Sequence, residues 1–556
     1  MIEPVDPITT EVVAHYLIAA SEEMGTALIK AAFSTAIKER ADCSTGIFDP
    51  EGDIIAQAQR CPIHLGSMIG TINRISMRFD PKAMKLGDMY AANDPYNGGG
   101  SHLPDITIVA PVFSKGELVA YVANIAHHSD IGGMVPGSLS SICTSIFQEG
   151  IRIPPVRLMS EGEIDQSVFD IILLNSRVPD ERDGDLRAQF ASNFVGCRAV
   201  EALFERFGIS KTRAAIASYL NFTERRIRAG IAGLKPGVYE ASDFVAGNNE
   251  NELAEIKLKL TVSADEIVLD FTETATQLKA SRNVTFQALN STVYSMIKAM
   301  VDPDVPANAG CFRPIRIVTK PGTIVEPLPP SAVGLRLTSC TVVGDVISMA
   351  LSQAMPDKAL ASCGSHQQLV LSGTDNRTGR FFVNHETLAG GLGARPYKDG
   401  MDAVRVPVSG AANLPIEVLE HSYPLRVERY ALRDESGGVG SYVGGFGVVR
   451  DYRILGDNVT VAITSGRQQA PATGLTGGGS GARGEFVLNP GTPSEKVLPS
   501  AVAAMPLPKG SLLRVCTPGG GGYGAASERS EDLVSADIRD GRFSSEGAQR
   551  FFSRKD

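Results

Sequence analysis

The feature that most constrains this chain is a pair of apolar segments separated by four turn-forming residues. The segments cover residues 106–113 (ITIVAPVF) and 118–126 (LVAYVANIA), and Ser114-Lys115-Gly116-Glu117 lies between them. Two such runs around a short glycine-containing loop are typical of a β-hairpin. We therefore predict two antiparallel strands whose side chains are paired across the hairpin.

This hairpin predicts where two metal-ligating side chains lie. If Phe113 faces Leu118, Asp105 lies opposite His127 to within one residue. Cross-strand neighbours are about 4.5–5.5 Å apart, so the carboxylate and the imidazole are expected to meet at the open end. His102 comes three residues before Asp105 and is expected to join them. Two imidazoles and a carboxylate suit zinc, manganese or iron, and three ligands leave positions for water. Taken singly, each histidine also has a structural interpretation, as a residue satisfied at a strand end.

Composition and charge exclude several classes of partner. The 556 residues are 43% hydrophobic and 21% charged, which is enough apolar material for several cores. A net charge of -9 argues against nucleic acid and anionic membranes as partners. We see no secretion signal and no apolar run near the ~20 residues that a membrane span needs. The eight cysteines form no CxxC, so we expect buried, reduced thiols in a cytoplasmic protein.

The pattern along the chain predicts an α+β fold in several regions. Asp6-Pro7 begins an amphipathic helix that is expected to end near Arg40. Further expected elements are a hairpin over 46–56, helices over 165–234, strands over 256–262 and 267–271, helices near 283–301 and 342–354, short strands over 366–516, and a last helix over 530–551. The glycine clusters at 474–484 and 519–522 are interpreted as tight β-turns rather than phosphate-binding loops.

We divide the chain into four regions from these changes of pattern. Residues 1–235 form an N-terminal metal-binding catalytic region of helices and antiparallel strands, and residues 236–362 form a central α+β region. Residues 363–526 form a β-rich C-terminal domain, and residues 527–556 form a polar tail.

Several motifs together resemble the hydantoinase B family. The most specific are NDPYNGGGSHLPD at 93–105 and HHSDIGG at 127–133. Further matches along nearly the whole chain are RADCS at 40–44, QEGIRIPP at 148–155, GGLGARP at 390–396, DESGG at 434–438 and TPGGGGYG at 517–524. That family includes subunits of N-methylhydantoinase, 5-oxoprolinase, caprolactamase, and acetone and acetophenone carboxylases.

The resemblance implies a metal site and a partner. Its metal ligands correspond to His102, Asp105, His127 and Asp42, and the last of these rests on the resemblance alone. The ion is one divalent transition metal, with zinc, manganese and iron left open. A hydantoinase A-type ATPase subunit would bind ATP and magnesium and phosphorylate the substrate carbonyl oxygen, in a heterotetramer of two A and two B subunits. The sequence contains no GxxxxGK[ST] motif, which agrees with ATP binding on the partner.

Five further residues are candidates for catalysis or substrate binding. His128 and Asp130 either orient a ligand or act as general acid or base, or they satisfy hydrogen bonds of a turn. Glu149 is a candidate base, or it pairs with a neighbouring arginine. His64 lines the pocket or lies in the core, and Arg395 is a candidate to hold a substrate carboxylate or ring oxygen.

The sequence supports three functional hypotheses. The first is a catalytic subunit that hydrolyses a hydantoin, N-methylhydantoin, 5-oxoproline or another lactam with ATP bound by its partner. The second is a subunit of an ATP-dependent carboxylase of the acetone or acetophenone type. The third is a metal-free structural partner of the ATPase subunit, against which the intact His102, Asp105 and His127 argue.

Overall fold

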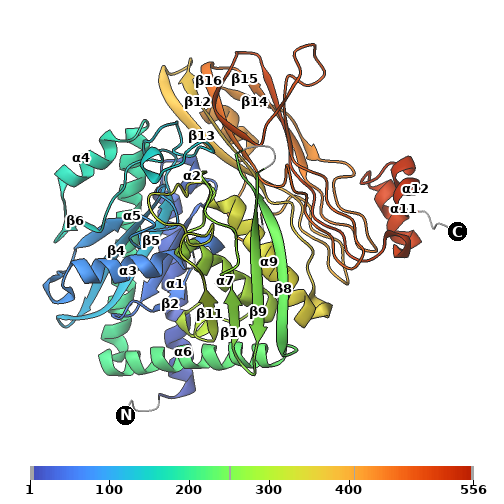
Figure 1. The fold of residues 1–556 in the computed structure, drawn as a ribbon. Helices are drawn as coiled ribbons and strands as arrows, with labels where there is room; N and C mark the ends of the chain where they lie inside the picture. Colours follow the sequence, from blue (N-terminus) through green and yellow to red (C-terminus); the bar gives the residue numbers. More distant parts are fainter. Residues whose placement is uncertain (1–4, 65, 249–251, 406, 553–556) are drawn as a thin grey trace.

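The computed structural model describes residues 5–64, 66–248, 252–405 and 407–552 (Figure 1). Its first helix, α1 (Pro7–Ala31), begins as predicted, because the Asp6 side chain accepts a hydrogen bond from the Thr9 N–H. The predicted continuation to Arg40 is wrong. The Asp185 carboxylate accepts hydrogen bonds from the N–H groups of Phe33 and Ser34, so the chain leaves the helix there and only a short α2 (Thr35–Lys38) follows.

A seven-stranded sheet is the framework of the N-terminal part (Figure 1). Its strands run in the order β2-β1-β5-β4-β3-β6-β7, and every neighbouring pair is antiparallel. They are β1 (Cys43–Phe48), β2 (Ile54–Gln57), β3 (Met89–Ala92), β4 (Asp105–Ser114), β5 (Glu117–His127), β6 (Val156–Ser160) and β7 (Glu163–Ile164). The hairpins predicted over 46–56 and 106–126 are both confirmed.

The hairpin β4–β5 brings the predicted ligands into direct register. Phe113 pairs with Leu118 beside the turn, as expected. An irregularity between Val112 and Phe113 then shifts the pairing by one residue, so that Asp105 pairs with His127. The bulge therefore places Asp105 directly opposite His127, a pairing that the sequence predicts only to within one residue.

Both faces of this sheet are buried. Val122 and Ile108 contribute to an apolar core with α1 and α5 (Pro179–Phe207), whereas Tyr121 and Ile125 contribute to a second core on the opposite face. Burial on both faces explains why these strands are apolar runs rather than alternating ones. The helices predicted over 165–234 are confirmed as α4 (Gln166–Leu174), α5 and α6 (Ile209–Ala232), and α3 (Ser67–Arg78) is a further one.

The central part contains a four-stranded sheet in the order β11-β10-β9-β8, with β10 and β11 parallel. Its strands are β8 (Gly237–Ala246), β9 (Leu253–Val262), β10 (Ile267–Asp270) and β11 (Ile315–Val318). The predicted helices are found as α7 (Phe286–Val301) and α9 (Arg336–Ala354), with a short α8 (Ala309–Phe312) between them. The largest apolar cluster joins side chains of this part, such as Val346, to Phe48 and Ile125 of the first sheet.

Two antiparallel sheets form most of the C-terminal part and enclose an apolar core of their own (Figure 1). The first has the order β13-β12-β16-β19, and the second has the order β14-β15-β20-β17-β18. The strands are β12 (His366–Asp375), β13 (Arg380–Ala389), β14 (Leu425–Leu432), β15 (Val448–Ile454), β16 (Asp457–Ser465), β17 (Glu485–Leu488), β18 (Lys496–Leu498), β19 (Ala501–Leu507) and β20 (Leu512–Cys516). A short α10 (Ile416–Ser422) precedes β14, and the tail has two helices, α11 (Glu531–Arg539) and α12 (Ser545–Phe552), where one was predicted. The α+β, multi-domain class is confirmed, and the four regional boundaries stay predictions.

The glycine clusters are mostly not the predicted tight turns. Only two residues of 474–484 form a turn, and none of 519–522 has a left-handed φ. These segments run extended and bond to neighbouring extended backbone, as where the Gly520 N–H donates to the Gly445 carbonyl over 2.9 Å. A Cβ atom added at Gly391 would lie 1.7 Å from that same carbonyl oxygen. Glycine is needed here because backbones approach too closely for any side chain.

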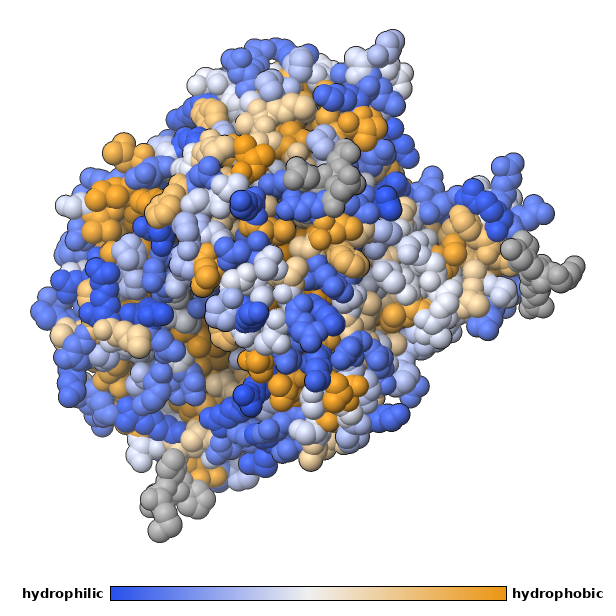
Figure 2. All heavy atoms as spheres, viewed as in Figure 1, coloured by the Kyte–Doolittle hydropathy of each residue, from blue (hydrophilic) through white to orange (hydrophobic). Residues whose placement is uncertain are grey.

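The surface is polar over most of the face in Figure 2, with scattered apolar side chains. Leu174 and Ile171 on α4 are 87% and 58% exposed, while Phe169 and Ile172 of the same helix are buried. All eight cysteines are free thiols, and seven of them are buried. Within the part of the chain that the structure describes, no helix is long and apolar enough to cross a membrane.

Candidate metal centre

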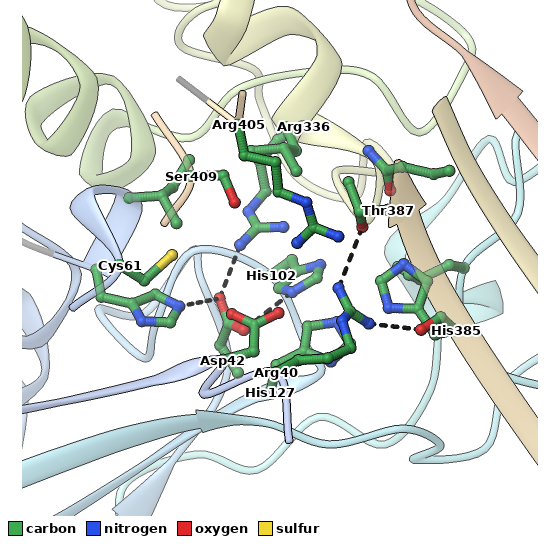
Figure 3. A pocket seen from close by; sticks show the side chains of 16 residues that line it. Arg40, Asp42, Cys61, His102, His127, Arg336, His385, Thr387, Arg405 and Ser409 are labelled. Atoms are coloured by element: carbon green, nitrogen blue, oxygen red, sulfur yellow. Dashed lines mark hydrogen bonds and ion pairs between the residues drawn. The ribbon is translucent and has the colours of Figure 1, made fainter. Parts of the chain in front are cut away.

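The three side chains predicted from the hairpin converge in a buried pocket, in which Figure 3 labels His102 and His127. One ligand atom from each of His102, Asp105 and His127 lies within 4.8 Å of the others. His102 Nε2 is 3.0 Å from Asp105 Oδ1, and the rings of His102 and His127 are 5.1 Å apart between centroids. All three residues are at most 4% exposed. The geometry therefore supplies three ligands of the types that zinc, manganese and iron accept.

The hydrogen bonds of His102 favour a cation beside it. Its Nδ1 lies 2.8 Å from the Gly334 carbonyl oxygen, which only accepts, so Nδ1 carries the proton and donates. Burial and the nearby Arg336 lower the pKa of His102, which favours the neutral ring. A neutral ring with a proton on Nδ1 turns the Nε2 lone pair toward the Asp105 carboxylate. An ion bound beside His102 Nε2 and Asp105 Oδ1, which lie 3.0 Å apart, would complete the arrangement of a carbonyl-oriented histidine ligand.

Asp105 is held as a carboxylate. Its Oδ2 accepts hydrogen bonds from Ser101 Oγ and from Arg336 Nη2, each at 2.8 Å. Burial acts to raise the pKa of Asp105, but His102 and Arg336 outweigh it and hold this pKa well below the usual range. Oδ1 is thereby left to face the histidines, as a ligand oxygen would.

His127 has the least satisfied side chain of the three. Neither of its ring nitrogens has a hydrogen-bond partner among the described residues. Burial lowers the pKa of His127 to about 3, so the ring is neutral and offers one lone pair. An unpaired polar side chain at this depth is costly unless something bonds to it. This orphaned imidazole is the observation that best fits a bound ion.

Asp42 lies at the edge of the same pocket. The His127 N–H donates to the Asp42 carbonyl over 3.0 Å, because β1 pairs with β5 beside the hairpin. Burial acts to raise the pKa of Asp42, but His127 and Arg40 lower it further than burial raises it. Ligand atoms of Asp42, Cys61 and His64 form a second group, also within 4.8 Å of one another.

His64 lines the pocket from the short 3-10 helix η1 (Pro62–His64). Its Nδ1 is 3.1 Å from Ser44 Oγ, and its Nε2 is 3.9 Å from Asp105 Oδ2. The structure therefore brings His64 together with Asp42, His102, Asp105 and His127.

The other sequence candidates lie outside this pocket. His128 points to α5, where its Nε2 is 3.0 Å from Gln189 Oε1. Asp130 accepts hydrogen bonds from the backbone N–H groups of Gly132 and Gly137 and pairs with Arg177. These contacts correspond to the structural interpretation of both residues.

Glu149 lies one layer behind the ligands, and Arg395 lies away from them. The Glu149 carboxylate accepts hydrogen bonds from the N–H groups of Val333 and Gly334, the residue whose carbonyl orients His102. Burial raises the pKa of Glu149 to about 7, although those two backbone donors oppose the shift. The Arg395 backbone bonds to Lys398 in an isolated bridge, and its side chain is not among those that line the pocket.

Sequence reasoning missed the arginines of the pocket. Arg40, Arg336 and Arg405 line it, and each is at most 8% exposed. His385 of β13 also lines it, stacked on His127 with 5.1 Å between ring centroids. Arg40 stands two residues before Asp42 in the RADCS motif, and this proximity could have identified it from the sequence. The other pocket residues come from distant segments and carry no such signal. The walls leave only about 30 Å³, so a ligand larger than an ion with its water requires the side chains to draw back.

The pocket and fold together define a class of protein in which an antiparallel hairpin carries a buried group of carboxylate and histidine side chains that could hold a metal ion. Residues 6–526 match the profile of the hydantoinase B/oxoprolinase family, and the chain belongs to that family. It is 36% identical to an uncharacterized protein of Methanocaldococcus jannaschii, over 99% of this chain and 96% of that protein. It is 31% identical to the B-type subunit of a putative D-/L-hydantoinase from a Pseudomonas species, over 98% and 95% of the two chains. The solved structure of an ATP-dependent caprolactamase from Pseudomonas jessenii matches with a TM-score of 0.90 and 28% identity, over 98% of this chain and 96% of that one.

Proposed function

We propose that this chain is the hydrolytic subunit of an ATP-dependent cyclic amide hydrolase. The observation that carries the proposal is the buried set of His102, Asp105 and His127, with an imidazole that lacks any partner among the described residues. Relatives named as a hydantoinase B-type subunit and as a caprolactamase support a cyclic amide as substrate. Hydantoins, N-methylhydantoin, 5-oxoproline and other lactams all belong to this class.

The proposed reaction adds water across the ring C–N bond. The first water adds to the phosphorylated carbon, the ring C–N bond breaks and the nitrogen takes a proton, which leaves an acyl phosphate. A second water hydrolyses the acyl phosphate to the carboxylate and phosphate, so that one ATP ends as ADP and phosphate. Amide resonance makes the carbon a poor electrophile, and phosphorylation of the oxygen by the partner removes that resonance. A divalent ion held by the pocket would lower the pKa of water toward ~7 and so supply the nucleophile.

The residues of this chain have separate roles in the proposal. His102, Asp105 and His127 hold the ion, and Asp42 is the proposed fourth ligand. Gly334 orients His102, and the enclosed walls exclude bulk water, which strengthens every charge interaction within. We place ATP and magnesium on a hydantoinase A-type partner, in an assembly of two A and two B subunits.

The proposal is tested by ATP-dependent turnover of the complex with that partner. Caprolactam, 5-oxoproline and hydantoin are supplied in turn, and ring opening is followed beside ADP release. We expect one of these rings to be opened with ATP, and His127→Ala to abolish opening while assembly and ATP binding by the partner persist. ATP turnover that requires bicarbonate and a ketone would instead assign the chain to the carboxylases. Full turnover by a metal-free complex would assign it a structural role.

A further inference from the structure

Several buried hydrogen-bond donors of the pocket have no partner among the described residues, and the proposed metal site does not use them. Arg40 Nε, Arg405 Nε and Gln368 Nε2 are buried, and none has a partner within the described ranges. Arg40 and Arg405 line the same cavity as His127 (Figure 3), and Gln368 is a further lining residue. Each unsatisfied donor at this depth costs free energy, so three such donors around one cavity indicate a ligand that accepts several hydrogen bonds.

The charges of the pocket point to an anion. Three buried guanidinium groups face two carboxylates, those of Asp42 and Asp105, and a divalent ion would add two more positive charges. Arg336 is committed to Asp105 through a contact of 2.8 Å. Arg40 and Arg405 have no carboxylate hydrogen-bonded to them in the part of the chain that the structure describes. Buried charges need compensation, and an anionic ligand would provide it.

The two guanidinium groups without a carboxylate partner, those of Arg40 and Arg405, are hydrogen-bonded to acceptors in different parts of the chain. Arg40 precedes β1, and its side chain donates to the His385 carbonyl and, over 3.4 Å, to Thr387 Oγ1 of β13. Arg405 donates through Nη1 to the Ala411 carbonyl over 3.0 Å. The next residue, Ala412, donates its N–H to the Arg40 carbonyl over 2.8 Å, which ties the two segments together. These contacts hold both guanidinium groups at the pocket, and the side chains around them must draw back from the cavity of about 30 Å³ to admit a phosphoryl group.

We infer that Arg40, Arg405 and Gln368 form an anion subsite that binds the phosphoryl group of the activated substrate beside the metal ligands. The choice of a phosphoryl group rests on the proposed function, whereas the affinity for an oxyanion rests on the donors alone. A phosphoryl group carries up to two negative charges and three strong acceptor oxygens, which matches two guanidinium groups and one amide. Arginine forks fit such oxygens better than lysine.

The test is calorimetric titration of the metal-loaded protein with inorganic phosphate. We expect Arg405→Gln to weaken phosphate binding about ten- to hundredfold, since a charged hydrogen bond is lost, and to leave the metal content unchanged. Gln368→Leu should weaken it less, and Arg405→Lys should retain part of it. The matched control is Arg380→Gln, an exposed arginine on β13, which should bind phosphate as the native protein does. Equal affinities in all five proteins would overturn the subsite.

A second titration with acetate separates the two sources of an oxyanion. Tighter binding of phosphate than of acetate, with the preference lost in Arg405→Gln, supports a phosphoryl subsite. Tighter binding of acetate would overturn it and assign the subsite to a substrate carboxylate. These titrations need neither ATP nor the partner, so a failure of ring hydrolysis would refute the proposed function without changing their result.

Discussion

The Glu149→Gln substitution gives the sharpest prediction about the layer behind the metal ligands. The glutamine oxygen can still accept from the N–H groups of Val333 and Gly334, so the local geometry is retained. The substitution replaces a carboxyl group that can lose a proton by an amide that cannot. Burial raises the pKa of Glu149 from 4.5 to about 7 in the folded chain, so folding favours its protonated form. A carboxyl group with a raised pKa is fully tolerated below pH 4.5 and destabilises the fold increasingly as the pH rises toward 7.

The size of the effect follows from that shift. Each unit of pKa corresponds to about 1.4 kcal/mol. Between pH 5 and pH 8, the native protein should lose about 2–3 kcal/mol of unfolding free energy relative to Glu149→Gln. The two proteins should therefore have similar stability at pH 5, and the variant should be the more stable one at pH 8.

The measurement is urea unfolding of both proteins at pH 5, 6, 7 and 8. Circular dichroism is the suitable signal, because the chain contains no tryptophan. Arg152→Gln serves as a control, since Arg152 pairs with Asp94 rather than with Glu149. A stability difference between native protein and Glu149→Gln that stays constant with pH would refute the prediction. Glu149 would then be ionised throughout and serve only as an acceptor for the backbone.

Two further predictions concern the fold around the site. Gly391→Ala should destabilise the C-terminal part by about 3 kcal/mol or more, because its Cβ would meet the Gly445 carbonyl oxygen at 1.7 Å. Gly233→Ala, whose Cβ finds its nearest atom at 3.3 Å, is the control, and thermal unfolding of the two variants compares them. His128→Ala should cost about 1–3 kcal/mol, since Gln189 Oε1 loses its partner, and should leave the bound metal in place. Loss of the metal from His128→Ala would show that His128 acts on the ligands after all.

The sequence predicts the convergence of His102, Asp105 and His127 because these residues are local to one hairpin. Asp105 and His127 are joined by 21 residues of strand and turn, and the pairing of the two strands decides where they meet. The end of α1 cannot be predicted in this way. It is set by hydrogen bonds to Asp185, which lies on a helix distant in the sequence. Arg336 and Arg405 cannot be predicted for the same reason, as they reach the pocket from the central and C-terminal parts.

The glycine clusters show a different limit. A run of glycines is compatible with tight turns and with extended backbones in close contact, since it permits both. What decides between them is the neighbouring segment, such as the backbone that Gly520 bonds to at Gly445. Residue composition does not identify the segment that lies beside a glycine cluster, so composition alone cannot distinguish tight turns from extended backbones in close contact.

The most direct test of the metal centre is elemental analysis of the purified protein beside His102→Ala and His127→Ala. His15→Ala is the matched control, because His15 is an exposed residue of α1 that pairs with Glu11 and does not line the pocket. We predict about one transition-metal ion per chain in the native protein and in the control, and its loss from both ligand variants. A native protein that binds no metal even after supplementation, or ligand variants that keep it, would contradict the metal centre and the hydrolytic role built on it.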